Sequence, residues 1–180
     1  MGLGDMVLIA SEGIPLRGRL SATVIRPDGT IRDHREGWNV VCTAGYTALA
    51  AALVWSGIQD QANNLGVTSP TFLTPLWGAL GSGSGTPAES DTALFSELGR
   101  QTVGAGASSP ATPSVAAEST WLFYFPQPPT TWSITEAGAF ANGTSTAGSG
   151  TLLDHWAFSP TITCPVTDTV LLQVSVLCGP

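Results

Sequence analysis

Few residues in this chain could do chemistry, and their types already exclude several functions. The 180 residues include two histidines, three cysteines and thirteen acidic residues, and all six basic residues are arginines. Without lysine there is no phosphate-loop lysine, no Schiff base and no Ser-x-x-Lys nucleophile pair. The six arginines are scattered in a chain of net charge -7, which argues against nucleic acid as a partner.

A hydrolytic triad would have to use His34 or His155. His34 lies in a charged stretch, whereas His155 follows Asp154 on an expected strand. Neighbouring strand residues point to opposite faces of a sheet, so Asp154 is badly placed to orient His155. The chain also lacks a Gly-x-Ser-x-Gly elbow. We therefore expect His155 to be a partly buried, hydrogen-bonded side chain and not a catalytic one.

Glu136 is the most unusual carboxylate of the sequence. It lies in an apolar strand, on the same face as Trp132 and Ile134. A buried carboxylate needs a partner, because an unpaired buried charge is costly. The candidates are Arg100, Arg19 and a cluster of backbone amides. We predict a structural anchor here, with Arg100 as the proposed partner, and we predict no catalytic residue in the chain.

The remaining candidate motifs favour structure over chemistry. Cys42, Cys164 and Cys178 lack the spacing of a zinc site, so no metal and no cofactor are predicted. They are expected to be buried thiols, although a Cys164–Cys178 bridge or an intersubunit bond stays open. The glycine-rich stretch 81–85 lacks the lysine and the third glycine of the nucleotide-binding motifs and is typical of a turn. Residues 142–144 match the glycosylation pattern but are better explained as a hairpin turn.

Composition indicates one folded domain with an unusually uncharged surface. Hydrophobic residues make up 43% of the chain and charged residues 11%, against about 25% charged in an ordinary soluble domain. The longest apolar stretch, residues 44–55, is shorter than the roughly 20 residues that cross a bilayer, so no membrane insertion is expected. Residues 1–10 lack the basic start of a signal peptide, which favours synthesis in a cytoplasm.

The first secondary-structure elements that the sequence predicts are a hairpin and a helix. Residues 20–24 alternate between apolar and polar, residues 27–29 form a Pro-Asp-Gly turn signal, and the charged stretch 32–36 is expected to be a solvated edge strand or turn. A helix is predicted at about 43–56, with Thr43 as its cap. It is apolar on nearly all faces, so we expect it to be buried, in part against another copy of the chain.

The rest of the sequence predicts short strands separated by glycine- and proline-rich turns. Residues 1–16 are expected to form an extended N-terminal arm, and residues 17–180 a single β-rich domain with an exposed Gly/Ala/Ser/Pro loop at about 101–117. Strands are expected at 76–80, 120–125, 132–140, 151–158 and 169–177, with a short helix or turn at 91–99. The predicted fold class is mainly β, a β-sandwich-like domain with one buried helix.

Six tryptophans give a second possible use for the surface. Aromatic rings can form a platform for sugars, but Trp77, Trp121, Trp132 and Trp156 all fall on expected strands. Most are therefore expected to be core or interface anchors, with glycan contact as the alternative.

The order of short motifs along the chain carries a family resemblance. The motifs are Trp38-Asn39-Val40-Val41, Thr43-Ala44-Gly45, the stretch 77–83, the stretch 86–94, Glu97-Leu98-Gly99-Arg100, the stretch 134–140 and the stretch 152–158. In this order they resemble small structural proteins of tailed bacteriophages, over roughly residues 20–177. An assembly protein of this kind needs apolar, sparsely charged faces to bury against its neighbours.

The resemblance implies a non-enzymatic virion protein that is tail-associated, in a fibre, tip or baseplate. A capsid (head) decoration or cement protein and a glycan-binding host-attachment module are the alternatives. It implies a homo-oligomer, expected to be a trimer, assembled in the bacterial cytoplasm with other virion proteins as partners and a host surface glycan as a further candidate. The expected anchors are Glu136, Arg100 and Asn39. The expected oligomer contacts are Leu8, Ile9 and Ile14 in the arm and Leu49, Leu53 and Trp55 in the helix.

Overall fold

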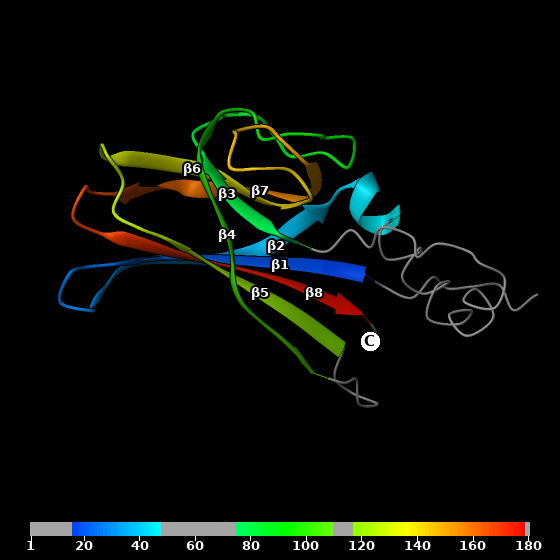
Figure 1. Ribbon diagram of the computed structural model, residues 1–180, viewed down its shortest axis with the longest axis horizontal. Coiled ribbons are helices and arrows are strands. Elements are labelled where there is room, and N and C mark those ends of the chain that lie inside the picture. Colours follow the sequence, from blue (N-terminus) through cyan, green and yellow to red (C-terminus); the bar gives the residue numbers. More distant parts are fainter. Residues whose placement is uncertain (1–15, 48–74, 110–116, 179–180) are drawn as a thin grey trace, which may run out of the picture.

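The computed structural model describes residues 16–47, 75–109 and 117–178, and eight antiparallel strands dominate these residues (Figure 1). The strands are β1 (Leu16–Ile25), β2 (Ile31–Val41), β3 (Trp77–Gly81), β4 (Glu97–Ser109), β5 (Ala117–Phe125), β6 (Trp132–Ala141), β7 (Thr151–Cys164) and β8 (Thr169–Cys178). The predicted mainly β class is confirmed. All the expected strands are present, most of them with somewhat wider bounds.

The strands close into a barrel in the order β1-β2-β7-β6-β3-β4-β5-β8, which corrects the expected sandwich. Two strands change partner along their length. The first part of β4 pairs with β3 as far as Thr102, and from Val103 onward it pairs with β5. The last residues of β2, Val40 and Val41, pair with β7, whereas residues 31–39 pair with β1. Strands that pass from one sheet to the other turn two facing sheets into one closed sheet.

The predicted hairpin forms β1 and β2. Leu20, Ala22 and Val24 are fully buried, as their alternation with polar residues requires. In the turn, the backbone N–H of Thr30 donates to Asp28 Oδ1 at 2.9 Å. The charged stretch 32–36 lies in β2 and pairs with β1 on one side. The interpretation of this stretch as an edge strand is therefore confirmed.

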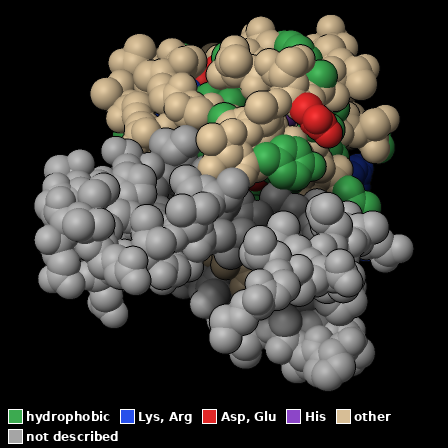
Figure 2. All heavy atoms as spheres, turned by 90° about the vertical axis from the view of Figure 1, so that its right-hand side faces the viewer, with side chains coloured by type: hydrophobic (Ala, Val, Ile, Leu, Met, Phe, Trp, Pro, Cys, Tyr) green, Lys and Arg blue, Asp and Glu red, His purple; other side chains and the backbone are tan. Residues whose placement is uncertain are grey.

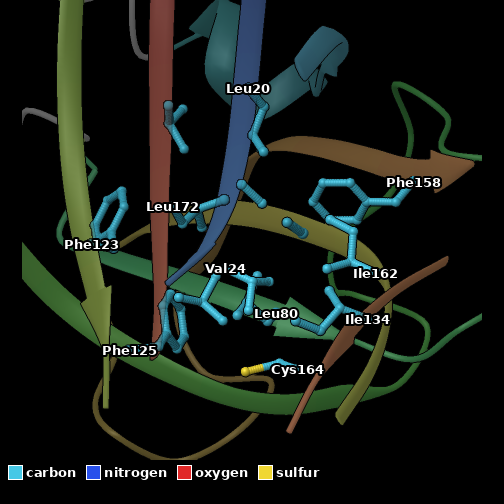
Figure 3. Packing of buried hydrophobic residues seen from close by; sticks show 14 of the residues in the cluster. Leu20, Val24, Leu80, Phe123, Phe125, Ile134, Phe158, Ile162, Cys164 and Leu172 are labelled. Carbon is cyan, nitrogen blue, oxygen red and sulfur yellow. The ribbon is translucent and has the colours of Figure 1, made fainter. Parts of the chain in front are cut away.

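One apolar core fills the barrel (Figure 3). Its fully buried members include Phe123, Phe125, Ile134, Ile162 and Leu172, which come from four different strands. Figure 3 shows these side chains converging on the barrel interior from opposite walls. Burying an aliphatic or aromatic side chain of this size contributes about 1.5–3 kcal/mol, so this interior supplies most of the stability of the fold.

Two expectations about loops and helices need correction. The expected exposed loop at 101–117 is largely strand, because β4 runs to Ser109 and β5 begins at Ala117. Small side chains gave this strand no apolar period, so its composition resembled that of a loop. Of the stretch 91–99, where a short helix or turn is expected, residues 91–96 form bends and no helix, and residues 97–99 belong to β4. Residues 110–116 lie outside the described residues.

The predicted helix begins at Thr43, and the structure describes residues 43–47 of it. Thr43 does not cap it. Its hydroxyl donates to the backbone oxygen of Glu89 at 3.1 Å. Tyr46 is 41% exposed in the single chain, so the expected burial of this helix against another copy of the chain stays a prediction. The rest of the expected helix, with Leu49, Leu53 and Trp55, and the arm, with Leu8, Ile9 and Ile14, lie outside the described residues.

Candidate functional site

The connection between β3 and β4, residues 82–96, lies over β3, β6 and β7 on the outside of the barrel and is held there by Glu136. It is the green loop at the top of Figure 1. The Glu136 carboxylate on β6 is 1% exposed. It accepts hydrogen bonds from the backbone N–H groups of Gly83 at 2.8 Å, Phe95 at 2.9 Å and Ser96 at 2.7 Å. One carboxylate therefore fixes both ends of this connection.

His155 joins Glu136 to a second carboxylate. Its ring is fully buried on β7, with Nε2 2.9 Å from Glu136 Oε2 and Nδ1 2.7 Å from Asp91 Oδ2. The Phe95 ring lies against it, with the two ring centres 4.8 Å apart. Asp91 Oδ2 also accepts from the Ala88 N–H at 2.8 Å. We call Glu136, His155 and Asp91 the loop clamp, because together they hold the start, middle and end of the 82–96 connection.

The loop clamp favours an ionised Glu136. Burial by itself disfavours the charged form and would raise the pKa of this carboxyl. The backbone donors of Phe95, Ser96 and Gly83 and the His155 ring outweigh this and hold the pKa below its ordinary value. A carboxylate that receives several N–H donors inside a protein is a stable, charge-assisted anchor.

Arg100 holds a second loop and does not pair with Glu136, so the expected Arg100–Glu136 pair is wrong. Its guanidinium forms a bidentate pair with Glu97, with both N···O distances 2.6 Å. It also donates to the backbone oxygen of Ser149 at 2.7 Å. Glu97 accepts in turn from the Gly148 N–H at 2.9 Å. This buried pair ties the turn between β6 and β7 to the start of β4, beside the loop clamp.

Asn39 and Asp154 form a third buried polar group. Burial raises the pKa of Asp154 to about 7, against the opposing influence of the Ala139 N–H and the nearby Asn39 side chain. Ala139 donates to Asp154 Oδ1 at 2.9 Å. Asn39 lies against Gly18, and among the described residues neither polar atom of its side chain has a hydrogen-bond partner of ordinary geometry. The expected role of Asn39 as an anchor therefore stays a prediction.

The arrangement of these groups suits holding loops more than reacting with a substrate. His155 has a carboxylate on each ring nitrogen, and within the described ranges no serine or cysteine side chain hydrogen-bonds to it. In the same part of the chain, no cluster of histidine, cysteine and carboxylate side chains is placed to hold a metal ion. The searched helical residues contain no segment that is long and apolar enough to cross a membrane.

The cysteines are placed as single thiols where the structure describes them. Cys42 and Cys164 are both buried and free, so the possible Cys164–Cys178 bridge is wrong. Burial is the main cause that raises the pKa of Cys42 to about 12 and that of Cys164 to about 11. Both thiols are therefore protonated and unreactive at neutral pH.

The tryptophans fall into two groups. Trp121, Trp132 and Trp156 pack against the main core, and Trp77 packs against a smaller cluster around Phe140, as expected. Among the described tryptophans the exception is Trp38 on β2, of which 59% is exposed. Trp38 belongs to one of the ordered motifs, and nothing in the sequence marks it as a surface ring.

Several residues of the site were not predicted. Asp91 lies 64 positions from His155 and Glu97 three positions from Arg100, and neither pairing was anticipated. The sequence signal that could have identified these residues is the set of ordered motifs. Its segments contain Gly83, Asp91, Glu97, Arg100, Glu136 and His155.

Comparison with known proteins adds no relative: no protein-family model, no curated protein and no solved structure matches the chain significantly.

Proposed function

We propose that this chain is a non-enzymatic structural component of a tailed-phage virion, assembled in the bacterial cytoplasm. A tail-associated place, in a fibre, tip or baseplate, is the leading proposal, and a head decoration protein is the alternative. The proposal rests first on the resemblance of the ordered motifs. It rests further on what those motifs do in this fold, because they supply the loop clamp and the Arg100–Glu97 pair.

The main support for this proposal is that the motif residues hold loops of the barrel in place. Glu136 uses its two oxygens on three backbone N–H groups and His155. Arg100 is 7% exposed, and its guanidinium donates hydrogen bonds to Glu97 and to the turn between β6 and β7. Groups committed in this way hold loops in a fixed shape, which is what an assembly protein must present to its neighbours.

The surface supports the same proposal. Large hydrophobic side chains are exposed on several parts of the barrel, namely Ile31, Trp38, Tyr46, Leu76, Phe95, Tyr124 and Val166. Figure 2 views the end of the molecule near residues 43–47, where most of the described surface is tan, with scattered green side chains and few charged ones. Apolar surface with little charge is suited to burial against other subunits. We propose a homo-oligomer, with a trimer as the expected form.

Two measurements test this proposal. The first is the mass of the purified full-length chain in solution, where the proposal predicts an oligomer and a monomer at all concentrations would contradict it. The second is immunogold labelling of intact particles of a phage that encodes the chain. Gold on the tail fits the leading proposal, gold on the head fits the alternative, and absence of the chain from washed particles would overturn both.

A further inference from the structure

The exposed Trp38 borders a pocket that the virion role leaves unused. The pocket has a volume of about 430 Å³ and is lined by Arg17 on β1, Trp38 and Val40 on β2, Tyr46 in the helix and Glu89 in the 82–96 connection. It therefore gathers side chains from four separate elements. Its volume lies within the range of roughly 300–1,000 Å³ that is usual for small-ligand sites.

The two aromatic rings give this pocket an accessible apolar surface. Trp38 is 59% exposed and Tyr46 41% exposed. The Arg17 guanidinium lies 5.7 Å from the centre of the Trp38 ring, a cation–π distance that restrains the ring. A restrained, exposed tryptophan loses little conformational entropy when a ligand stacks on it.

The polar groups of the pocket have both signs. Glu89 supplies an exposed carboxylate, which accepts hydrogen bonds, and Arg17 supplies a guanidinium, which donates them. One negative and one positive group leave the pocket with little net charge, so they favour a neutral ligand that carries both donors and acceptors. A ring with an apolar face and hydroxyl groups on its edge satisfies the aromatic and the polar groups together.

A second hollow continues past Glu89. It has a volume of about 560 Å³ and a mainly apolar surface, to which Thr43, Thr47, Thr92 and Leu152 contribute. Glu89 borders both hollows, and the backbone oxygen of Glu89 accepts hydrogen bonds from the N–H and the hydroxyl of Thr43. Glu89 therefore lies between the pocket beside Trp38 and this second hollow.

We propose that this pocket binds a neutral saccharide, with one pyranose ring stacked on Trp38 and its hydroxyls paired with Glu89 and Arg17. A second sugar unit would lie in the hollow beyond Glu89. This gives the glycan-binding alternative a definite site, and it does not depend on where the chain lies in a particle. A hydrophobic peptide or a second copy of the chain on the same pocket would be a different outcome of the test below.

The test is a titration of the purified full-length chain with glucose, galactose, N-acetylglucosamine and the disaccharides lactose and chitobiose, followed by ligand-observed NMR. The variants are Trp38→Ala and, as a matched control, Tyr124→Ala, which removes an aromatic ring that is 54% exposed on β5 outside this pocket. Thermal unfolding of both variants shows that they are folded.

We expect at least one sugar to bind saturably to the wild type and with equal affinity to Tyr124→Ala. Trp38→Ala is expected to weaken that binding about tenfold or more, which corresponds to about 1.4 kcal/mol of stacking. A disaccharide is expected to bind more tightly than its single unit, and Glu89→Gln to cost less than Trp38→Ala. No binding by any of the five sugars, equal binding by Trp38→Ala, or a change of oligomer mass in Trp38→Ala without sugar binding would overturn the proposal. None of these results bears on whether the chain is found in virions.

Discussion

Two glutamates of this chain have the same side chain and opposite surroundings. Glu136 is buried and receives three backbone N–H donors and a His155 contact. Glu36, on β2, pairs with Arg19 at 2.6 Å, and both side chains of that pair are about half exposed. The pKa of both carboxyls is lowered, Glu36 chiefly through its hydrogen bond with Arg19. Only Glu136 fixes a long connection. A charged side chain therefore contributes most to this fold where it accepts hydrogen bonds from backbone N–H groups that have no backbone acceptor.

The largest effect is expected from Glu136→Ala. It leaves the N–H groups of Gly83, Phe95 and Ser96 without their acceptor and leaves His155 with one carboxylate. Removing one partner from a buried charged network costs about 3 kcal/mol or more. Urea unfolding monitored by tryptophan fluorescence measures this. A loss no larger than that of Glu36→Ala would break the comparison.

Arg100→Ala is expected to cost nearly as much, about 2–3 kcal/mol, because it leaves the buried Glu97 unpaired. Arg100→Lys should recover little of the loss, since an ammonium group cannot reproduce the bidentate contact with Glu97 and the donation to Ser149. The same unfolding experiment compares the three proteins. Full rescue by lysine would mean that position 100 needs only a positive charge.

The pH dependence of Asp154→Asn gives an intermediate effect. Burial raises the pKa of Asp154 to about 7, whereas the unfolded carboxyl titrates near about 3.9. Between these values the folded state binds the proton more tightly, so the contribution of Asp154 to stability falls as the pH rises from about 4 to 7. Asparagine keeps an oxygen for the Ala139 N–H and does not titrate.

The free energy of unfolding of Asp154→Asn, relative to the wild type, should therefore increase by roughly 1 kcal/mol or more between pH 4 and pH 7.5. Urea unfolding at the two pH values measures this difference. Glu136 has the opposite sign, because its lowered pKa gives stability above the unfolded pKa that is lost as the pH falls through the folded one. A pH-independent difference for Asp154→Asn would show that Asp154 ionises normally in the folded protein.

The smallest effect is expected from Glu36→Ala. It removes the contact with Arg19, but exposed ion pairs contribute little because water and salt screen them. Its thermal unfolding midpoint should match that of the wild type at low and at high salt. A clear destabilisation at low salt that disappears at high salt would assign the outer hairpin a larger electrostatic role than this account gives it.

The sequence predicted best where one local pattern decides the structure. The hairpin was predicted from the strict alternation of apolar and polar residues at 20–24 and from the Pro-Asp-Gly turn, in which Asp28 accepts a hydrogen bond from the Thr30 N–H. The final strand followed from Val170, Leu172 and Val174, which are all fully buried. The start of the helix at Thr43 was also found, although the cap was not. Each of these features depends on neighbours a few positions apart in the chain.

The sequence failed where partners are distant or are backbone groups. The closed barrel depends on β2 and β4 changing partners, and no residue type marks such a change. The second half of β4 consists of glycine, alanine and serine, which carry no strand period. The donors to Glu136 are backbone amides, which the sequence offered beside Arg100 and Arg19, but every residue possesses such an amide, so the sequence did not show which ones bind. The ordered motifs do contain the residues of the loop clamp and the Arg100–Glu97 pair, but they do not indicate which of these residues hydrogen-bond to each other.

The most direct test of the loop clamp is amide hydrogen exchange, resolved by residue, in the wild type and in Glu136→Gln. Slow exchange is expected at Gly83, Phe95 and Ser96 in the wild type, because their N–H groups donate to a buried carboxylate. In Glu136→Gln, protection should fall selectively at these three amides while that of β1 and β8 persists. Unchanged protection at Gly83, Phe95 and Ser96 would contradict the claim that Glu136 fastens this connection to the barrel.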